Sequence, residues 1–244
     1  MMIEVNQENL LVLVPAFNEE QSVAEVLTAI LDEGFIPLLI SDGSTDKTAL
    51  IGRRSGSLVI ELPYNLGVGG ALRAGFKYAV NNNYEAIVQI DADGQHPADE
   101  ISNLINAANL TGAHMVIGSR FLNPSSDMNI GSTRRIAMRF LSASATASTG
   151  VRITDSTSGF RLIRNPLLEQ FSRNFANNYL GDTYESIISA GRSNHKVVEI
   201  SARLREREFG ESTAKTGSAV AFTLKGLAVS MLGLHKRLKP VGQD

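Results

Sequence analysis

The sequence predicts an α/β fold with a mostly parallel central sheet flanked by helices. Short apolar runs alternate with amphipathic segments over the first 120 residues of the 244-residue chain. Strands that alternate with helices of roughly 10–15 residues are typical of βαβ units. Polar loops follow several of the apolar runs, at the position where open parallel sheets bind ligands. A chain of this length is long enough for one such domain.

Each expected element follows from the local spacing of apolar residues. Continuous apolar runs favour buried strands, and these cover residues 10–14, 36–40, 57–61, 86–90, 113–117 and 196–202. Apolar residues spaced by three and four favour helices, and these cover residues 18–32, 46–53, 69–80, 98–109 and 133–149. In the first helix this spacing is carried by Val23, Val26, Leu27, Ile30 and Leu31. No internal repeat interrupts the order.

Residues 217–239 form a separate pattern near the end of the chain. Six apolar residues lie on one helical face: Val220, Leu224, Leu227, Met231, Leu234 and Leu238. Lys225 and two glycines argue against a helix that spans a bilayer. The helix either packs on the domain or lies in a membrane interface. We therefore expect a catalytic domain over residues 1–216 and an amphipathic helix with a tail over residues 217–244.

Composition excludes several classes of function. Apolar residues make up 43% of the chain and charged residues 20%, which is typical of a globular protein. The net charge of −2 gives no basic field for nucleic acid. The absence of cysteine excludes disulfides, thiolate metal sites and a cysteine nucleophile. The first ten residues lack a basic region followed by an apolar run, so we expect a cytoplasmic protein.

The most informative motif is a pair of carboxylates after the fourth expected strand. Asp91 and Asp93 follow the apolar run 86–90 and are one residue apart. Carboxylates at the carboxyl end of a strand suit Mg²⁺ or Mn²⁺, which complete their coordination with water and substrate phosphates. The alternative for this motif alone is a solvated Asp-Gly turn.

Three other loops follow neighbouring strands and are expected at the same edge of the sheet. Asn18 in the first loop is expected to cap the following helix and to leave its amides facing a ligand. In the second loop, Asp42 can accept hydrogen bonds from a base or ribose, and Asp46 is expected to cap a helix. The third loop, residues 65–73, contains glycines that allow close backbone approach, but it matches no nucleotide-binding fingerprint.

In order, these motifs read P-A-F-N-E, D-G-S-T-D, N-L-G-V-G-G-A, D-A-D-G-Q-H-P and G-S-R-F. They are followed by D-S-T-S-G-F-R at 155–161 and R-E-F-G-E-S at 207–212. The series resembles glycosyltransferase family 2 on the GT-A fold, which is a Rossmann-like nucleotide-diphospho-sugar transferase fold. Within the family it is most similar to the polyprenyl- or dolichyl-phosphate sugar synthase branch. The resemblance covers residues 11–212, most of the chain.

The resemblance implies roles for individual residues. The nucleotide pocket would be lined by Pro15, Ala16, Asn18, Glu19 and Asp42. Further substrate contacts are expected from Gly69, Arg73, Ala92 and Ser212. The metal would be held by Asp91, Asp93 and Gln95. The acceptor phosphate would be bound by Arg120, Arg134 or Arg135, and Arg207, because a guanidinium matches the geometry of a phosphate.

The resemblance also implies a reaction. A sugar would pass from a UDP- or GDP-sugar to a polyprenyl phosphate at the cytoplasmic membrane face, with Mg²⁺ or Mn²⁺ on the diphosphate. The acceptor oxygen is already an anion, so the expected step is direct displacement with inversion and without a strong general base. Asp91, Asp93, Arg120 and Arg207 are the expected catalytic residues.

The chain departs from the family pattern in three places. Ser41 stands where branch members often carry an acidic residue, and Thr213 stands where a lysine is expected. Many relatives end in membrane spans, so this chain would reach the membrane through residues 217–239 or through a small membrane-protein partner. One alternative function is transfer to a glycan, protein or small-molecule hydroxyl, with Asp155 as the base. Another is a nucleotide-sugar-binding protein without turnover.

Overall fold

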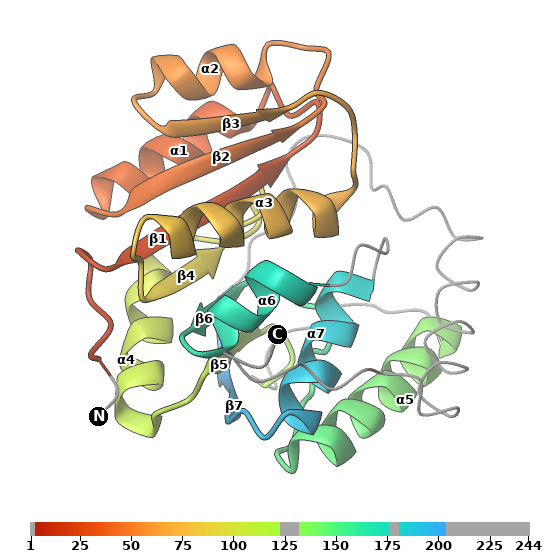
Figure 1. Cartoon of the computed structure of the whole chain (residues 1–244). Coiled ribbons are helices and arrows are strands. Elements are labelled where there is room, and N and C mark those ends of the chain that lie inside the picture. The colour runs from red at the N-terminus through yellow and green to blue at the C-terminus, as the bar shows by residue number, and fades with distance from the viewer. Residues whose placement is uncertain (1–2, 123–131, 176–180, 204–244) are drawn as a thin grey trace.

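The computed structural model describes residues 3–122, 132–175 and 181–203. These residues form a seven-stranded sheet in the order β3-β2-β1-β4-β6-β5-β7, in which β6 runs antiparallel to both neighbours (Figure 1). The strands are β1 (Leu10–Ala16), β2 (Ile36–Asp42), β3 (Leu58–Leu62), β4 (Ala86–Gln89), β5 (Met115–Ser119), β6 (Arg161–Arg164) and β7 (Val197–Ser201). The helices are α1 (Val23–Asp32), α2 (Thr48–Arg54), α3 (Val68–Asn81), α4 (Ile101–Thr111), α5 (Ser132–Thr149), α6 (Leu167–Asn174) and α7 (Gly181–Arg192). A 3₁₀ turn, η1 (Ala98–Glu100), precedes α4. The mostly parallel α/β fold predicted from the sequence is confirmed.

Helices cover both faces of the sheet, and alternate residues of one strand supply both cores. On β1, Val12 and Val14 pack in the core that contains α1 and α4. Leu11 and Leu13 pack in the opposite core, with α3, α5, α6 and α7. Successive side chains of a strand point to opposite faces, so a strand covered on both sides is continuously apolar. The apolar run at 10–14 therefore identified a central strand.

The order in which successive strands join the sheet reverses at β1. β2 pairs with one edge of β1 and β4 with the other, both in parallel. The helix α1, which follows β1, and α4, which follows β4, pack in the same core, so the loops after these two neighbouring strands leave the sheet edge toward one face. Open α/β sheets bind ligands at this topological switch point. The fold places residues 15–22 and 90–97 there.

The sequence analysis did not predict β6 or α6. β6 has only four residues and carries an arginine at each end, which does not resemble a buried strand. Arg161 is nevertheless 2% exposed, because its guanidinium donates to the carbonyl oxygens of Ser158 and Thr183 and to Ser186 Oγ. These bonds make a buried arginine tolerable, and two of the partners, Thr183 and Ser186, are distant in sequence.

Within the described ranges, no helix is both long enough and apolar enough to cross a bilayer. The expected helix at 217–239 and the proposed boundary at residue 216 lie outside these ranges, and both stay predictions.

The buried His195, which contacts the half-buried His114, makes the stability of the fold depend on pH. The rings of His114 and His195 meet edge to face with centroids 5.0 Å apart, and His195 Nε2 bonds Gln170 Oε1 at 2.9 Å. Burial, followed by the charge of His114, lowers the pKa of His195 from 6.5 to about 4. The unfolded chain therefore binds a proton at higher pH than the folded chain does.

We expect the free energy of unfolding to fall as the pH drops from about 6.5 to about 4, and to fall less in His195→Gln. Urea unfolding of both proteins at pH 8, 6, 5 and 4 measures this difference. At pH 8 the histidine is neutral in both states, so the variants are compared there for loss of packing alone. Equal slopes below pH 6.5 would contradict the assignment.

Candidate active site

The loops after β1 and β2 are joined by hydrogen bonds between backbone and side chains. Asn18 has a left-handed backbone with φ 56°. Its amide donates to Ser44 Oγ at 3.1 Å, and its Oδ1 accepts from the amide of Thr45 at 2.9 Å. The amide of Glu19 donates to Thr48 Oγ1 at 2.9 Å. These contacts fix the shape of the predicted nucleotide pocket before any ligand is bound.

The prediction that Asn18 caps the first helix is wrong. The helix α1 begins at Val23, and Ser22 is its N-cap residue. Asn18 lies one turn earlier, and its side-chain oxygen serves the neighbouring loop. The N-cap residue of α2 is Lys47, and Asp46 lies one residue before it. The Oδ1 of Asp46 still accepts from the amide of Thr48 at 2.9 Å, at the start of the helix.

Asp42 ties the loop after β2 to the loop after β3. Its carboxylate is 3% exposed, and Oδ1 accepts from the amide of Leu66 at 2.7 Å. Burial raises the pKa of Asp42, and the backbone hydrogen bonds from Leu66 and Gly67 oppose that rise. A side chain on Gly43 would lie 2.5 Å from the backbone of Tyr64 and Asn65. The two loops are therefore pressed together at the start of α3.

Two other predicted substrate contacts belong to α3. Gly69 is buried in the first turn of the helix. Arg73 is half-buried, and its Nη2 donates to the carbonyl oxygen of Arg173 in α6 at 3.2 Å. The structure thus connects Arg73 to α6, and its predicted contact with substrate stays a prediction.

Asp91 and Asp93 follow β4 at the switch point. The carboxylate of Asp91 is 40% exposed, and its Oδ1 lies 3.4 Å from Gln89 Nε2. Asp93 Oδ1 accepts from the amide of Gln95 at 3.1 Å, which closes a tight turn in which Gly94 has φ 78°. Ala92 between them is buried. The chain therefore presents two carboxylates on a turn that their own hydrogen bonds define.

The donor set fits a hard divalent cation that is shared with substrate. No group of three or more His, Cys, Asp or Glu residues in the described part of the chain is arranged to hold a metal. Mg²⁺ commonly takes one or two carboxylates and fills its remaining positions with phosphate oxygens and water. Asp91 and Asp93, with Gln95 beside them, match that requirement without a complete protein cage.

Arg120 is held by an ion pair with the buried Asp155, near Asp91. Its Nε and Nη2 donate to both oxygens of Asp155 at 2.8 and 3.0 Å, and Nη2 also donates to Thr157 Oγ1 at 3.1 Å. Burial alone would lower the pKa of Arg120, but its bonds to Asp155 and the charges of Asp155 and Asp91 raise it. Arg120 thus stays a cation beside Asp91.

Asp155 is poorly suited to the role of a general base. Its side chain is 0% exposed. Burial alone would raise the pKa of Asp155, but the bonds and charge of Arg120 outweigh burial and lower it. The amide of Asp155 donates to Glu199 Oε1 at 2.7 Å, so the strand β7 also holds the segment that carries Asp155. A carboxylate with this low pKa and without solvent access cannot readily accept a substrate proton.

The structure describes only some of the other residues that were predicted to bind the acceptor phosphate. Arg134 and Arg135 belong to α5, but their side chains are not among those described. Arg207 and Ser212 lie outside the described residues. Glu199 and Gly159 were not singled out by the sequence analysis, because their roles depend on contacts across the fold.

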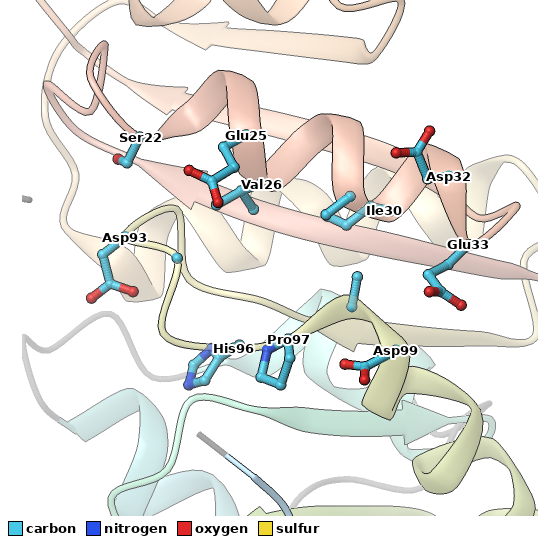
Figure 2. Close-up of a pocket in the computed structure, with 13 residues that line it drawn as sticks. Ser22, Glu25, Val26, Ile30, Asp32, Glu33, Asp93, His96, Pro97 and Asp99 are labelled. Atoms are coloured by element: carbon cyan, nitrogen blue, oxygen red, sulfur yellow. The ribbon is translucent and has the colours of Figure 1, made fainter. Parts of the chain in front are cut away.

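A groove of about 350 Å³ meets this site at Asp93 and runs along α1 (Figure 2). Figure 2 shows Asp93 at one end and Asp32 and Glu33 at the other, with His96 and Asp99 on the wall opposite α1. Its lining contains five carboxylates and no lysine or arginine. The charge of these carboxylates disfavours a diphosphate in the groove. The predicted nucleotide site at the strand ends stays a prediction.

The family model for glycosyl transferase family 2 matches residues 11–172. The chain belongs to this family. It is therefore a glycosyltransferase. An uncharacterized protein of Methanocaldococcus jannaschii is 30% identical to this chain, and the alignment covers 91% of this chain and 93% of that protein. Undecaprenyl-phosphate mannosyltransferase of Micrococcus luteus is 28% identical, and the alignment covers 93% of this chain and 98% of that protein.

The fold of this family 2 glycosyltransferase is GT-A, as expected from the motifs. Glucosyl-3-phosphoglycerate synthase from Mycobacterium tuberculosis, solved with Mn²⁺, UDP and glucosyl-3-phosphoglycerate, superposes with a TM-score of 0.68. The alignment covers 96% of this chain and 81% of that chain at 20% sequence identity.

Removing the partner of Arg120 should destabilise the protein. We expect Asp155→Ala to lower the free energy of unfolding by about 3 kcal/mol or more, since a mostly buried cation loses its partner. The matched control is Glu61→Ala, which removes the surface partner of Arg53 and should cost less than about 1 kcal/mol. Urea unfolding at pH 7 compares the two variants. Equal losses would show that the Arg120–Asp155 pair behaves as a surface pair.

Proposed function

We propose that this glycosyltransferase moves a sugar from a UDP- or GDP-sugar to a polyprenyl phosphate, with inversion, at the cytoplasmic membrane face. The observation that carries the proposal is the position of Asp91 and Asp93 at the β1–β4 switch point, with the mostly buried cation Arg120 near Asp91. The similar mannosyltransferase of Micrococcus luteus is named for undecaprenyl phosphate, and it aligns over nearly its whole length. That relative supports a lipid phosphate as acceptor.

The residues divide the reaction between a donor side and an acceptor side. The loops that carry Asn18 and Asp42 hold the nucleotide, and Asp91 and Asp93 face its diphosphate with Gln95. A bound Mg²⁺ or Mn²⁺ supplies Lewis-acid stabilisation of the leaving diphosphate. Arg120 lies on the acceptor side, where its guanidinium favours a phosphate anion.

An anionic acceptor removes the need for a general base. A phosphate oxygen is already deprotonated at neutral pH, so it can attack the anomeric carbon directly as the sugar–diphosphate bond breaks. The protein then contributes orientation and electrostatic stabilisation. The buried, paired state of Asp155 supports this route over transfer to a hydroxyl, which needs a base.

The outer face of α5 supports contact with a membrane. Residues 128–154 contain four arginines and no acidic residue. Phe140 is 56% exposed on this helix and Val151 is 38% exposed just after it. A hollow of about 350 Å³ between α5 and residues 152–154 combines apolar side chains with Arg139 and Arg152. Exposed apolar and cationic groups together favour an anionic lipid surface.

The substrate assignment is tested by extraction of a labelled lipid. The purified protein is incubated with Mn²⁺ and a panel of labelled UDP- and GDP-sugars, with and without a short polyprenyl phosphate. We expect label in the organic phase only with the acceptor, in a product of inverted anomeric configuration. Retained configuration would contradict direct displacement, and label that requires a hydroxyl acceptor would contradict the lipid phosphate.

Asp93→Ala tests the metal assignment in the same assay. We expect transfer to fall to background, because one of two carboxylates that face the diphosphate is lost. The control is Asp32→Ala, which removes a carboxylate from the far end of the same groove and should leave transfer unchanged (Figure 2). Unchanged turnover in Asp93→Ala would remove the metal from the proposal.

Liposome flotation tests the membrane contact. We expect Arg139→Glu/Arg152→Glu to lower partitioning to anionic vesicles about tenfold or more, since each basic residue near such a surface contributes about 1 kcal/mol. The control Arg53→Glu/Arg54→Glu reverses two exposed arginines on α2 and should float like the parent chain. Equal partitioning of both double variants would contradict contact through α5.

A further inference from the structure

The segment D-S-T-S-G-F at residues 155–160 packs directly against the first carboxylate of the metal motif. A methyl group on Gly159 would lie 2.8 Å from Oδ2 and 3.0 Å from Oδ1 of Asp91. Both distances are shorter than van der Waals contact, so only glycine leaves room for the carboxylate in this orientation. The backbone at residue 159 therefore acts as a wall on one side of Asp91.

A second contact holds the backbone of Asp91. The amide of Asp91 donates to His96 Nδ1 at 3.0 Å, which leaves the ring proton of a neutral His96 on Nε2. His96 is 8% exposed, and its ring stacks on that of Phe160 with centroids 5.4 Å apart and planes at 26°. The imidazole is thus enclosed, and it serves as a backbone acceptor.

The ring of Phe160 is itself fixed by the same segment. The backbone amide of Phe160 donates to Ser158 Oγ at 3.2 Å. The Ser158 hydroxyl in turn donates to the carbonyl oxygen of Gly118 at 2.6 Å. The amide of Gly118 donates to the carbonyl oxygen of Phe160 at 2.9 Å. Phe160 is 0% exposed. The end of β5 therefore anchors Phe160, which in turn limits the movement of His96.

We propose that Gly159, Phe160 and His96 are positioning residues that fix the orientation of the Asp91 carboxylate toward the donor's metal ion. This inference rests on the proposed function. It assigns His96 to the backbone of Asp91, and it gives the D-S-T-S-G-F segment a role on the donor side. Groups that orient a metal ligand typically change metal affinity about 10- to 100-fold when they are lost.

The test measures Mn²⁺ binding to the full chain by electron paramagnetic resonance, with and without UDP and without any turnover. We expect His96→Leu to weaken Mn²⁺ binding about tenfold or more, because the acceptor for the Asp91 amide is lost. We expect His96→Asn to bind Mn²⁺ nearly as the parent does, since its side-chain oxygen can replace Nδ1 as acceptor. The matched control is His114→Leu, which removes a similar ring-to-backbone bond to Lys196 at 3.1 Å, remote from the site.

Gly159→Ala is a second variant that leaves His96 intact. We expect it to weaken Mn²⁺ binding about tenfold or more, because the added methyl group displaces the carboxylate. Its control is Gly52→Ala, which introduces a comparable clash, 2.3 Å from Leu39 Cδ2, on α2. That control should lose thermal stability but keep its affinity for Mn²⁺, which separates positioning from general damage.

The outcomes distinguish this inference from the proposed function. If the parent chain binds Mn²⁺ and both His96→Leu and Gly159→Ala bind it within about twofold, the positioning role is overturned while the metal assignment stands. If the parent chain binds no Mn²⁺ even with nucleotide present, the metal assignment and this inference are both overturned. A loss in His96→Leu that His96→Asn restores supports the positioning role.

Discussion

The candidate site depends on one constraint, which is that β1 pairs in parallel on both sides. Leu13 pairs with Leu38 of β2 and with Gln89 of β4, so three strands end at the same edge. Parallel strands need crossovers, and right-handed crossovers in opposite directions place their helices on opposite faces of the sheet. The helix α1 packs in one core and α3 in the other (Figure 1). The strand order therefore reverses at β1, and the loops after β1 and β4 begin at neighbouring strand ends.

At this edge of the sheet, the Arg120 guanidinium and the Asp91 carboxylate carry opposite charges. Arg120 is close enough to Asp91 for the carboxylate to raise its pKa. In a low dielectric, such a pair attracts strongly and would compete with a metal for the carboxylate. Asp155 prevents this by binding the guanidinium at two points, and Glu199 holds the Asp155 loop through backbone amides. The pair therefore holds the guanidinium on Asp155 and leaves the Asp91 carboxylate, which is 40% exposed, available to the proposed metal.

The sequence predicted the half of the fold in which local pattern and tertiary environment agree. Strands such as β1 are apolar throughout because both faces are covered, and the two aspartates follow directly from the end of such a strand. β6 could not be predicted in this way, because Arg161 is buried through partners at Thr183 and Ser186. The same reason explains Asn18, whose side chain bonds the loop after β2. Local rules treat an asparagine before a helix as a cap, and they contain no information about the neighbouring loop.

The site residues show a similar division. The sequence could identify Asp91 and Asp93, because their chemistry depends on strand position and residue type. It could not show that Gly159 contacts Asp91 or that His96 accepts from the Asp91 backbone, since both contacts join segments that are brought together only by the sheet. The partner of Arg120 was likewise hidden, because 35 residues separate it from Asp155. Family motifs gave the residue types, and the fold gave the partners.

The distribution of charge also relates the two substrates of the proposed reaction. Carboxylates line the groove along α1, while residues 128–154 carry arginines and no acidic residue. Figure 1 shows α1 and α5 at opposite ends of the molecule. An anionic membrane would attract the α5 end and repel the α1 groove, and this torque would orient the chain before contact. Arg120 is bonded to Asp155, which follows the residues that line the hollow against α5, so this orientation would also bring Arg120 toward the lipid phosphates.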